Sequence, residues 1–357
     1  MDISLSCSVQ KILFFSINGS GMGHMNRCLA YARRLQGKAD ISFFSLSSAV
    51  DFIEEMGFKA EYFVSPFWSA NSNYEWNYEL TIRLGLMLER AQPDVIVFDG
   101  IWPYQGFMAA CGAYDKPLKL VWSNRGLLKA NAKKVTVDPA QFDLVIVPGE
   151  LGATYAADGN KITTPPVCLM DADELLPTAE ARQALGLPAA GRYVLLSLGP
   201  GNLKNVDDIG LRLIRQFREQ GVNVVWACTS ITVRDTPLPE GVIPISVYPL
   251  VRYMRAFDYI VGAAGYNTCC ELVQTQIPGL LVPNTLLADD QARRAAMVAA
   301  NAPVIVSACD TEAACTQAVQ DLVQLAARHT PAPCPLAMNG ADIAAEAILA
   351  LTQGCRA

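Results

Sequence analysis

The sequence is poor in charge, in histidine and in long apolar runs, and each shortage argues against a class of function. Of its 357 residues 17% are charged, and the net charge of −6 gives no support to nucleic-acid binding. No apolar run reaches the roughly 18 residues that a membrane-spanning helix needs. The opening MDISLSCSVQ lacks the basic and apolar regions of a signal peptide. We therefore expect a protein of the cytoplasm.

Patterns of metal-binding residues are scarce as well. The eleven cysteines include no Cys-x-x-Cys pair, and only two histidines, His24 and His329, could join them in a zinc site. An odd number of cysteines in a large chain favours reduced thiols over a disulfide framework. We therefore expect no zinc site.

The chain does contain a repeated alternation of short apolar runs with amphipathic stretches. Runs such as KILFFSI (11–17) and PDVIVFDG (93–100) are continuous, as strands buried on both faces should be. Such alternation is typical of a parallel sheet covered by helices on both faces. It pauses in the proline-containing stretch 163–192 and restarts at YVLLSLGPGN (193–202). We predict an α/β fold with two Rossmann-like domains of similar size.

A glycine-rich turn that contains a histidine follows the first apolar run. In NGSGMGHMNRCLAYARRL (18–35), glycines at 19, 21 and 23 would allow tight turning and close approach of a substrate. The spacing is not the Gly-x-Gly-x-x-Gly of dinucleotide sites, because position 24 is histidine. In open α/β sheets this edge is where ligands bind, which favours His24 as a general base over a histidine that is merely satisfied in a loop.

Other polar residues end strands at the same predicted edge. Asp99 closes the strand PDVIVFD and could hold one ring N–H of His24, although an aspartate there is also a common turn residue. Ser123 and Asn124 follow KLVW. They are candidates for an acceptor pocket, with ordinary loop polarity as the equal alternative.

The second half contains a further turn that suits an anion. After the strand DYIVGAAG (258–265), NTCCELVQT opens a helix for which we predict Asn267 or Thr268 as the cap. Backbone N–H groups at such an end suit a diphosphate. Glu271, about one turn further on, is a good acceptor for two ribose hydroxyls. The carboxylates and amide of ADDQ (288–291) suit sugar hydroxyls.

With these motifs the chain resembles the GT-B nucleotide-sugar glycosyltransferases, in particular the group of UDP-glycosyltransferases and the peptidoglycan N-acetylglucosaminyltransferase. The carboxy-terminal signature of that family is small-small-Gly-x-Asn-Ser/Thr-x-x-Glu, then Pro, then Asp-Gln. Residues 263–271, Pro278, Pro283 and Asp290-Gln291 match it, and GSGMGHMNR matches the family's Gly-x-Gly-His loop. The order of elements agrees over nearly the whole chain.

The resemblance implies a GT-B fold: an acceptor-side domain of residues 1–165, a donor-binding domain of 166–338, and a last helix within 339–357 that crosses back to the first domain. It implies an inverting, metal-independent transfer from a UDP-sugar, with dTDP not excluded, and no cofactor. His24 would be the base and Asp99 its partner. The donor-binding residues so implied are Gly21, Gly23, Ser197, Gly199, Asn202, Val247, Leu250, Gly265, Asn267, Thr268, Glu271, Asp290 and Gln291.

The sequence departs from this family at two positions. Many relatives have His or Arg where this chain has Ala263, so other donors must support the diphosphate. Gln276 replaces a common glycine, which affects only how a helix ends.

Aromatic residues gather in 63–88, a region that shapes acceptor sites in such relatives. Trp68 and Trp76, with Tyr74 and Tyr78, could stack on an acceptor or contact a membrane lipid, or pack in the core and loops. The acceptor could be a small molecule, a glycan or a lipid-linked sugar, with peripheral contact at the inner face of the membrane. Lys133-Lys134 gives weak support to that contact.

Three other functions remain open at this stage. GMGHMNRCLA also resembles the corresponding loop of the UDP-sugar hydrolase of pseudaminic acid biosynthesis, in which water replaces the acceptor. The extra length of this chain favours a transferase. A nucleotide-sugar epimerase and a non-catalytic nucleotide-sugar-binding protein are the remaining alternatives.

Overall fold

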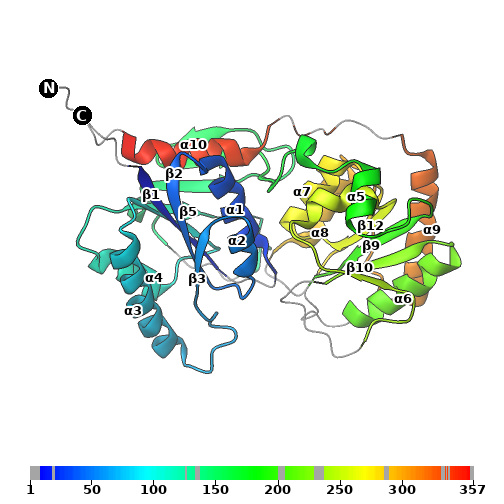
Figure 1. Cartoon of the computed structure of the whole chain (residues 1–357), viewed down its shortest axis with the longest axis horizontal. Coiled ribbons are helices and arrows are strands. Elements are labelled where there is room, and N and C mark those ends of the chain that lie inside the picture. The colour runs from blue at the N-terminus through cyan, green and yellow to red at the C-terminus, as the bar shows by residue number, and fades with distance from the viewer. Residues whose placement is uncertain are drawn as a thin grey trace.

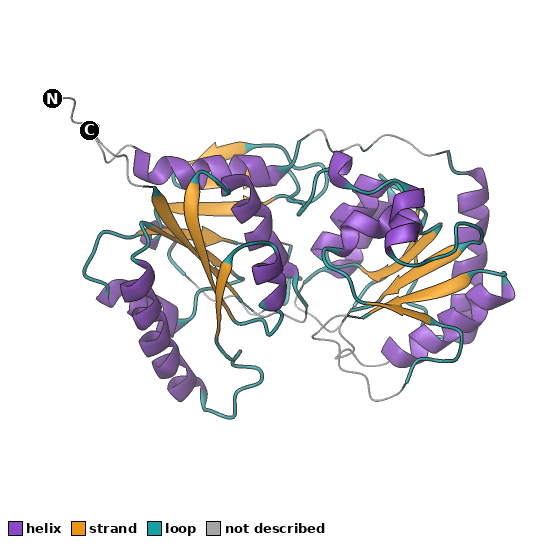
Figure 2. Cartoon of the chain, viewed as in Figure 1, coloured by secondary structure: helices purple, strands orange, loops and turns teal. Residues whose placement is uncertain are grey.

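The computed structural model shows two α/β lobes that lie side by side along the long axis of the molecule (Figure 1). It describes residues 9–17, 21–124, 127–132, 137–199, 206–228, 237–284, 289–330, 334, 336 and 338–353. Each lobe is a sheet flanked by helices (Figure 2). The α/β architecture expected from the alternation of apolar runs is confirmed.

The first sheet has eight strands in the order β3-β2-β1-β4-β5-β6-β8-β7. All neighbours are parallel except β7 and β8. The strands are β1 Gln10–Ser16, β2 Ala39–Ser45, β3 Lys59–Tyr62, β4 Val95–Asp99, β5 Lys119–Ser123, β6 Leu144–Pro148, β7 Ala156–Asp158 and β8 Lys161–Thr164.

The continuous apolar runs of these strands serve two cores, one on each face of the sheet. Ile12 and Phe14 of β1 pack on the face covered by α1 (Gly23–Leu35) and α10 (Gly340–Gln353). Leu13 and Phe15 pack on the opposite face with α3 (Asn73–Ala91) and α4 (Gln105–Ala113). Because successive side chains of a strand point to opposite faces, a strand that is covered on both sides must be apolar throughout.

The second sheet has six strands in the order β11-β10-β9-β12-β13-β14, all parallel. They are β9 Tyr193–Ser197, β10 Asn223–Ala227, β11 Ile243–Ile245, β12 Tyr259–Ala263, β13 Gly279–Val282 and β14 Val304–Val306. The remaining helices are α2 Asp51–Glu55, α3 Asn73–Ala91, α4 Gln105–Ala113, α5 Thr178–Ala184, α6 Val206–Glu219, α7 Tyr266–Thr275, α8 Gln291–Ala299 and α9 Glu312–Arg328, with 3-10 turns at Pro139–Gln141, Ala172–Glu174 and Leu250–Ala256.

The carboxy-terminal helix α10 packs against α1 of the first lobe, as the resemblance implies (Figure 1). Its residues Ala341, Ala344, Ala345 and Ile348 are buried. The chain reaches this place through Gly340, where an added Cβ would lie 2.0 Å from the carbonyl oxygen of Pro165. Only glycine permits that approach. One hydrophobic cluster runs from this helix pair through residues 167–170 to α7 of the second lobe.

Among the described helices, none is both long enough and apolar enough to cross a bilayer.

Candidate functional site

Each sheet has one point at which its strand order changes direction, and the candidate residues gather at these two points. In the first sheet this point lies between β1 and β4, and in the second between β9 and β12. The carboxyl ends of the paired strands align, Ser16 with Asp99 and Ser197 with Gly262. In open α/β sheets a crevice for ligands forms beyond such a switch point. The topology therefore provides two subsites, one in each lobe.

His24 and Asp99 meet at the first switch point, as predicted. His24 is the second residue of α1, which follows β1, and Asp99 is the last residue of β4. The His24 Nδ1 and Asp99 Oδ1 atoms are 2.6 Å apart, and both side chains are buried. A carboxylate has no proton to donate, so Nδ1 carries the proton and Nε2 is the basic nitrogen.

Arg27 is a third member of this buried group, and sequence reasoning missed it. Its Nε donates to Asp99 Oδ2 at 2.6 Å and its Nη2 donates to Asp99 Oδ1 at 2.7 Å. Arg27 lies three residues after His24, so both side chains occupy one face of α1. That spacing is the signal that could have identified it.

The charges in this group stabilise one another. Burial alone would raise the pKa of Asp99, but the charge of Arg27 and the hydrogen bonds from His24 and Arg27 outweigh it and hold that pKa well below its usual range. For Arg27, burial favours the neutral form, yet the charge of Asp99 raises the guanidinium pKa further above its usual value. Asp99 and Arg27 are therefore an ion pair beside the imidazole.

The second switch point contains the amino terminus of α7. The helix begins at Tyr266, one residue before the predicted cap, and its N-cap is Gly265. The prediction of Asn267 or Thr268 as the cap is wrong, because the turn already ends in extended backbone at Gly265. Within the described residues no side chain caps the helix, its first turn has no acidic residue, and an added Cβ on Gly265 would meet no described atom within 4 Å. This end of the helix is thus open and electropositive.

Asn267, Thr268 and Glu271 lie on α7 and are partly exposed. Burial raises the pKa of Glu271 to about 7. Among the residues that the structure describes, none forms a hydrogen bond or ion pair with its carboxylate. A partly buried carboxylate to which no described residue donates is suited to bind a ligand's hydroxyl groups.

The other residues predicted at the donor subsite have varied surroundings. Ser197 ends β9, and Gly199 follows it in the left-handed region with φ 98°. Val247 and Leu250 are half-buried. Gly21 and Gly23 have open space where a Cβ would lie. Asn202 lies outside the described residues.

Asp290 and Gln291 begin α8, and both already make contacts within the protein. The Asp290 carboxylate caps the helix by accepting from the backbone N–H of Arg293, and Oε1 of buried Gln291 accepts from the backbone N–H of Asn284 at 2.8 Å. Neighbouring Asp289 is instead paired with Arg294, at 2.8 and 2.9 Å. Whether Asp290 and Gln291 hold a donor sugar stays a prediction.

The residues predicted on the acceptor side separate into buried and exposed groups. Ser123 is buried, and its hydroxyl lies 3.2 Å from that of Tyr31 on α1, so it packs beneath the site and does not line an open acceptor pocket. Asn124 is partly exposed. Trp76 does not face an acceptor: it is fully buried, with its indole N–H bonded to the Val64 carbonyl, because it lies on the inward face of α3. Trp68 is 59% exposed.

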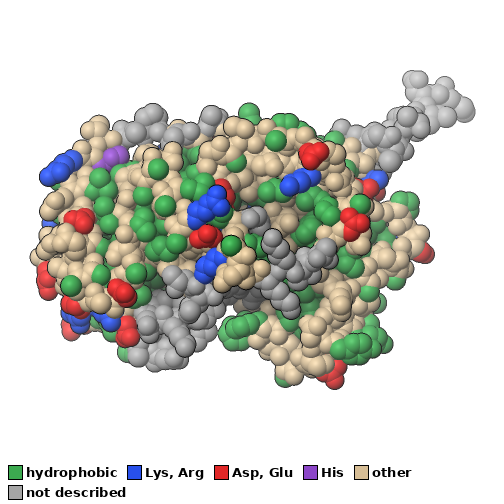
Figure 3. Space-filling model, turned by 180° about the vertical axis from the view of Figure 1, so that it is seen from behind, with side chains coloured by type: hydrophobic (Ala, Val, Ile, Leu, Met, Phe, Trp, Pro, Cys, Tyr) green, Lys and Arg blue, Asp and Glu red, His purple; other side chains and the backbone are tan. Residues whose placement is uncertain are grey.

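Further aromatic and aliphatic side chains continue this exposed surface along α3. Tyr74, Tyr78, Ile82 and Leu86 follow one another at intervals of four residues and are all exposed. Figure 3, which views the molecule from behind, shows hydrophobic side chains at the lower edge of the first lobe. Lys133-Lys134 lies outside the described residues.

A buried cluster joins the two lobes next to the site, and sequence reasoning did not find it. Tyr266 of α7 donates its hydroxyl proton to the Gly149 carbonyl at 2.9 Å and accepts from the Val167 N–H at 2.8 Å. The guanidinium carbons of Arg27 and Arg294 lie 5.7 and 5.9 Å from the centre of its ring. No local pattern marks Tyr266, because its partners come from distant segments.

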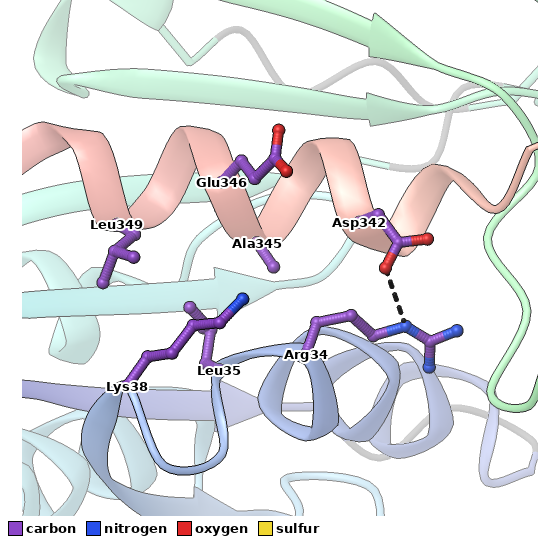
Figure 4. Close-up of a pocket in the computed structure, with 7 residues that line it drawn as sticks. All are labelled: Arg34, Leu35, Lys38, Asp342, Ala345, Glu346 and Leu349. Atoms are coloured by element: carbon purple, nitrogen blue, oxygen red, sulfur yellow. Dashed lines mark hydrogen bonds and ion pairs between the residues drawn. The ribbon is translucent and has the colours of Figure 1, made fainter.

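A small pocket lies elsewhere, between α1 and α10 at the end of α1 that is remote from His24 (Figure 4). Its lining mixes charges, and Arg34 Nε donates to Asp342 Oδ1 across it at 3.3 Å. In the described part of the chain, no group of three or more His, Cys, Asp or Glu side chains could hold a metal ion.

Comparison with known proteins adds to this geometry. No protein-family model matches the chain. The UDP-N-acetylglucosamine–N-acetylmuramyl-(pentapeptide) pyrophosphoryl-undecaprenol N-acetylglucosamine transferase of Bacillus licheniformis is 23% identical over 109 residues, which are 28% of this chain and 30% of that protein. The match thus spans less than a third of the curated relative.

Solved structures match over nearly the full length. Spinosyn forosaminyltransferase SpnP is 16% identical, with a TM-score of 0.62 over 96% of this chain and 95% of that one. Spinosyn rhamnosyltransferase SpnG, complexed with thymidine diphosphate, is 16% identical, with a TM-score of 0.58 over 98% of this chain and 100% of that one. The two facing α/β lobes and the returning helix α10 are therefore those of the GT-B glycosyltransferase fold.

Proposed function

We propose that the protein transfers a sugar from a nucleoside-diphosphate sugar to an acceptor hydroxyl, with inversion at the sugar carbon and without a metal ion. One observation carries the proposal. The helices that follow the two switch-point strands, α1 and α7, meet amino end to amino end across the lobe boundary, so that Arg27 lies over Tyr266. A donor bound at α7 would therefore face His24.

The first lobe would supply the base. Nε2 of His24 accepts the proton of the acceptor hydroxyl while the acceptor oxygen forms its bond to the sugar's anomeric carbon. Asp99 keeps Nδ1 protonated and stabilises the imidazolium that forms. The bond between the anomeric carbon and the diphosphate oxygen breaks, and the electron pair leaves with the diphosphate.

The second lobe would hold the donor. Uncapped N–H groups at Gly265, Asn267 and Thr268 stabilise the departing diphosphate, since the positive end of a helix favours an anion. Ser197 and Gly199 approach the diphosphate from the end of the neighbouring strand β9. The backbone from Val247 to Leu250 contacts the nucleobase of the donor. Asp290 and Gln291 contact the sugar.

Glu271 favours UDP over dTDP as the nucleotide. Its carboxylate can accept from both hydroxyls of a ribose, whereas a deoxyribose offers only one. The curated relative is named for a UDP-sugar and SpnG was solved with thymidine diphosphate, so both nucleotides belong in a donor screen.

The exposed apolar surface of the first lobe, the proposed acceptor side, favours a hydrophobic acceptor. Trp68, Tyr74 and Tyr78 are exposed, but the same face of α3 includes the carboxylates of Glu75 and Glu79. Anionic membranes attract clusters of Lys and Arg, so these carboxylates disfavour a lipid surface. We therefore place a hydrophobic alcohol or aglycone ahead of a lipid-linked sugar.

The test combines a donor screen with product analysis. Thermal shift with UDP- and dTDP-sugars identifies the donor, and mass spectrometry with and without acceptors separates transfer from hydrolysis. His24→Ala should leave donor binding nearly intact and slow transfer by at least about a hundredfold. His329→Ala is the matched control, since His329 is the other histidine of the chain and lies at the end of α9. Full transfer by His24→Ala would remove His24 from the mechanism, and free sugar formed without an acceptor would favour the hydrolase.

A further inference from the structure

We propose that Arg27 and Tyr266 are positioning residues for the His24–Asp99 pair, and that docking of α7 against α1 holds this pair in its working geometry. The inference rests on the proposed function, because it explains how the donor-binding lobe would hold His24, the proposed general base, in its working orientation. It starts from three contacts that join Asp99, Arg27 and Tyr266 in series.

The first link is the orientation of Asp99. Its Oδ1 must face Nδ1 of His24, and Arg27 fixes that orientation because two guanidinium nitrogens bond both carboxylate oxygens. A planar, two-point contact restricts rotation of a carboxylate in a way that a single point charge does not. Arg27 is 2% exposed, so water does not substitute for either bond.

The second link is the orientation of Arg27 itself. The guanidinium lies over the ring of Tyr266, a residue of the opposite lobe, at 5.7 Å from its centre. An aromatic face attracts a desolvated cation and favours an arginine in a defined position. Arg27 is therefore held from Asp99 on one side and from the second lobe on the other.

The third link is the fixed position of Tyr266. Its backbone belongs to α7, whereas its hydroxyl is bonded to Gly149 and Val167. On the same ring lies Arg294, which is paired with Glu150 and Asp289. The ring keeps this place only while α7 stays docked against the first lobe.

Tyr266 also stands between Gly265 and Asn267, two residues of the proposed diphosphate site. The residue that holds Arg27 in place is therefore also part of the first turn of α7, so the proposed diphosphate site and the His24–Asp99 pair are connected through one side chain.

The test uses four variants in the full-length protein. Arg27→Lys keeps the charge but cannot make both bonds to Asp99, and Arg27→Gln removes the charge. Tyr266→Phe keeps the ring and loses the hydroxyl, and Tyr266→Leu loses the ring. Arg33→Gln is the matched control, because Arg33 also extends from α1 across the lobe boundary, to Glu174, without touching Asp99.

The kinetic readout is the separation of kcat from donor affinity. Both Arg27 variants and Tyr266→Leu should lower kcat by about tenfold or more, since small misplacements of catalytic groups have effects of that size or larger. Donor affinity should change much less in the Arg27 variants. Tyr266→Phe keeps the ring but loses the bonds to Gly149 and Val167, so its kcat should fall between those of the wild type and Tyr266→Leu. The double variant Arg27→Gln/Tyr266→Leu should be no slower than Arg27→Gln alone, because both changes break one chain of contacts.

A spectroscopic readout needs no substrate. The chain has two histidines, so a spectrum of ¹⁵N-labelled histidine rings contains two sets of signals, and His329→Gln assigns them. Tyr266→Leu should move the His24 signals toward those of Arg27→Gln and Tyr266→Phe should move them less, whereas Arg33→Gln should leave them in place. Unmoved His24 signals in Tyr266→Leu, or additive losses in the double variant, would overturn the proposal. If the His24 signals move as expected but no donor is turned over, the positioning role of Arg27 and Tyr266 is supported and the proposed sugar transfer is excluded.

Discussion

At the scale of single residues, the site depends on ionised groups that are buried. Asp99 has no exposed surface, yet its pKa lies below the ordinary value of 3.8 because Arg27 and His24 favour the charged form over the cost of burial. A carboxyl group whose folded pKa is depressed contributes stability above its unfolded pKa and loses it as the pH falls through the folded value. Asp99 is therefore ionised over the whole range in which an enzyme would be assayed.

Asp99→Asn should harm both activity and folding. Transfer should fall by at least about a hundredfold, because the imidazole loses the partner that fixes its tautomer. The free energy of unfolding should fall by up to about 3–5 kcal/mol near neutral pH, since Arg27 is left buried without its counter-ion. Urea denaturation at several pH values measures this loss, which should shrink below about pH 4, because Asp99 of the unfolded wild type then binds a proton that the folded state does not bind. A loss of equal size at pH 3 and pH 7 would contradict the assigned charge state.

Glu271→Gln should stabilise the fold at pH 8 while it weakens nucleotide binding. Burial raises the pKa of Glu271 from 4.5 to about 7, so folding favours the protonated form. The associated stability is present below about pH 4.5 and is lost as the pH rises through about 7. Glutamine has no such loss, and the variant should melt at a higher temperature than the wild type at pH 8.

The same variant should bind UDP about tenfold more weakly at pH 8, because a neutral amide accepts a hydroxyl proton less strongly than a carboxylate does. In the wild type, UDP affinity should rise as the pH increases through about 7, and the preference for UDP over dTDP should rise with it. Isothermal titration calorimetry at pH 6 and pH 8 checks both statements. UDP affinity that does not change in the variant would place the ribose elsewhere.

At the scale of elements, no side chain in the described part of the chain caps the first turn of α7. Gly265 provides the N-cap without a side chain, and the first turn contains no acidic residue. Ordinary helices satisfy these N–H groups with Ser, Thr, Asp or Asn. An uncapped start at a switch point is the arrangement that a bound anion would complete.

Gly265→Ala tests whether the amino end of α7 binds the diphosphate. A Cβ at Gly265 meets nothing within 4 Å and its φ is −67°, so the melting temperature should change little. The methyl group would occupy the space next to the N–H groups, and nucleotide affinity should fall by about tenfold or more, a change of roughly 1.4 kcal/mol. Thermal melting and calorimetry measure the two quantities.

Gly85→Ala is the control for that experiment. Gly85 lies within α3 and also has open space at its Cβ, so alanine should stabilise the helix by up to about 1 kcal/mol. It should leave nucleotide binding unchanged. Equal affinity in Gly265→Ala and Gly85→Ala would exclude the amino end of α7 as the diphosphate site.

At the scale of the whole molecule, the two lobes share more than a linker. The hydrophobic cluster that contains α1 and α10 continues into α7, and the pairs Tyr266–Gly149 and Arg294–Glu150 cross the same boundary. A large apolar boundary with buried polar pairs favours concerted unfolding over independent domains. Helix α10 strengthens this connection because the end of the chain returns to the first lobe.

We therefore expect the wild type to unfold in one transition. Ile348 of α10 is fully buried, and Ile348→Ala should lower the free energy of unfolding by about 2–5 kcal/mol through loss of packing. Tryptophan fluorescence reports mainly on the first lobe, where four of the five tryptophans lie, and far-UV circular dichroism reports on both lobes. The two curves should coincide in both proteins. An earlier fluorescence transition in the variant would show that the lobes unfold separately.

The sequence by itself determined the class of fold and predicted the sheet edges at which the candidate site residues lie. Continuous apolar runs require strands covered on both faces, and the residues that follow such strands lie at one edge, so the places of His24, Asp99 and the helix after DYIVGAAG followed from local pattern. Only the tertiary structure decided that Trp76 belongs to the core, that Gly265 is the N-cap, and that Arg27, Tyr266 and Arg294 form one cluster. The physical reason is that burial and ion pairing depend on which distant segments meet. A local pattern determines the direction of a side chain, but the packed lobes determine what that side chain contacts.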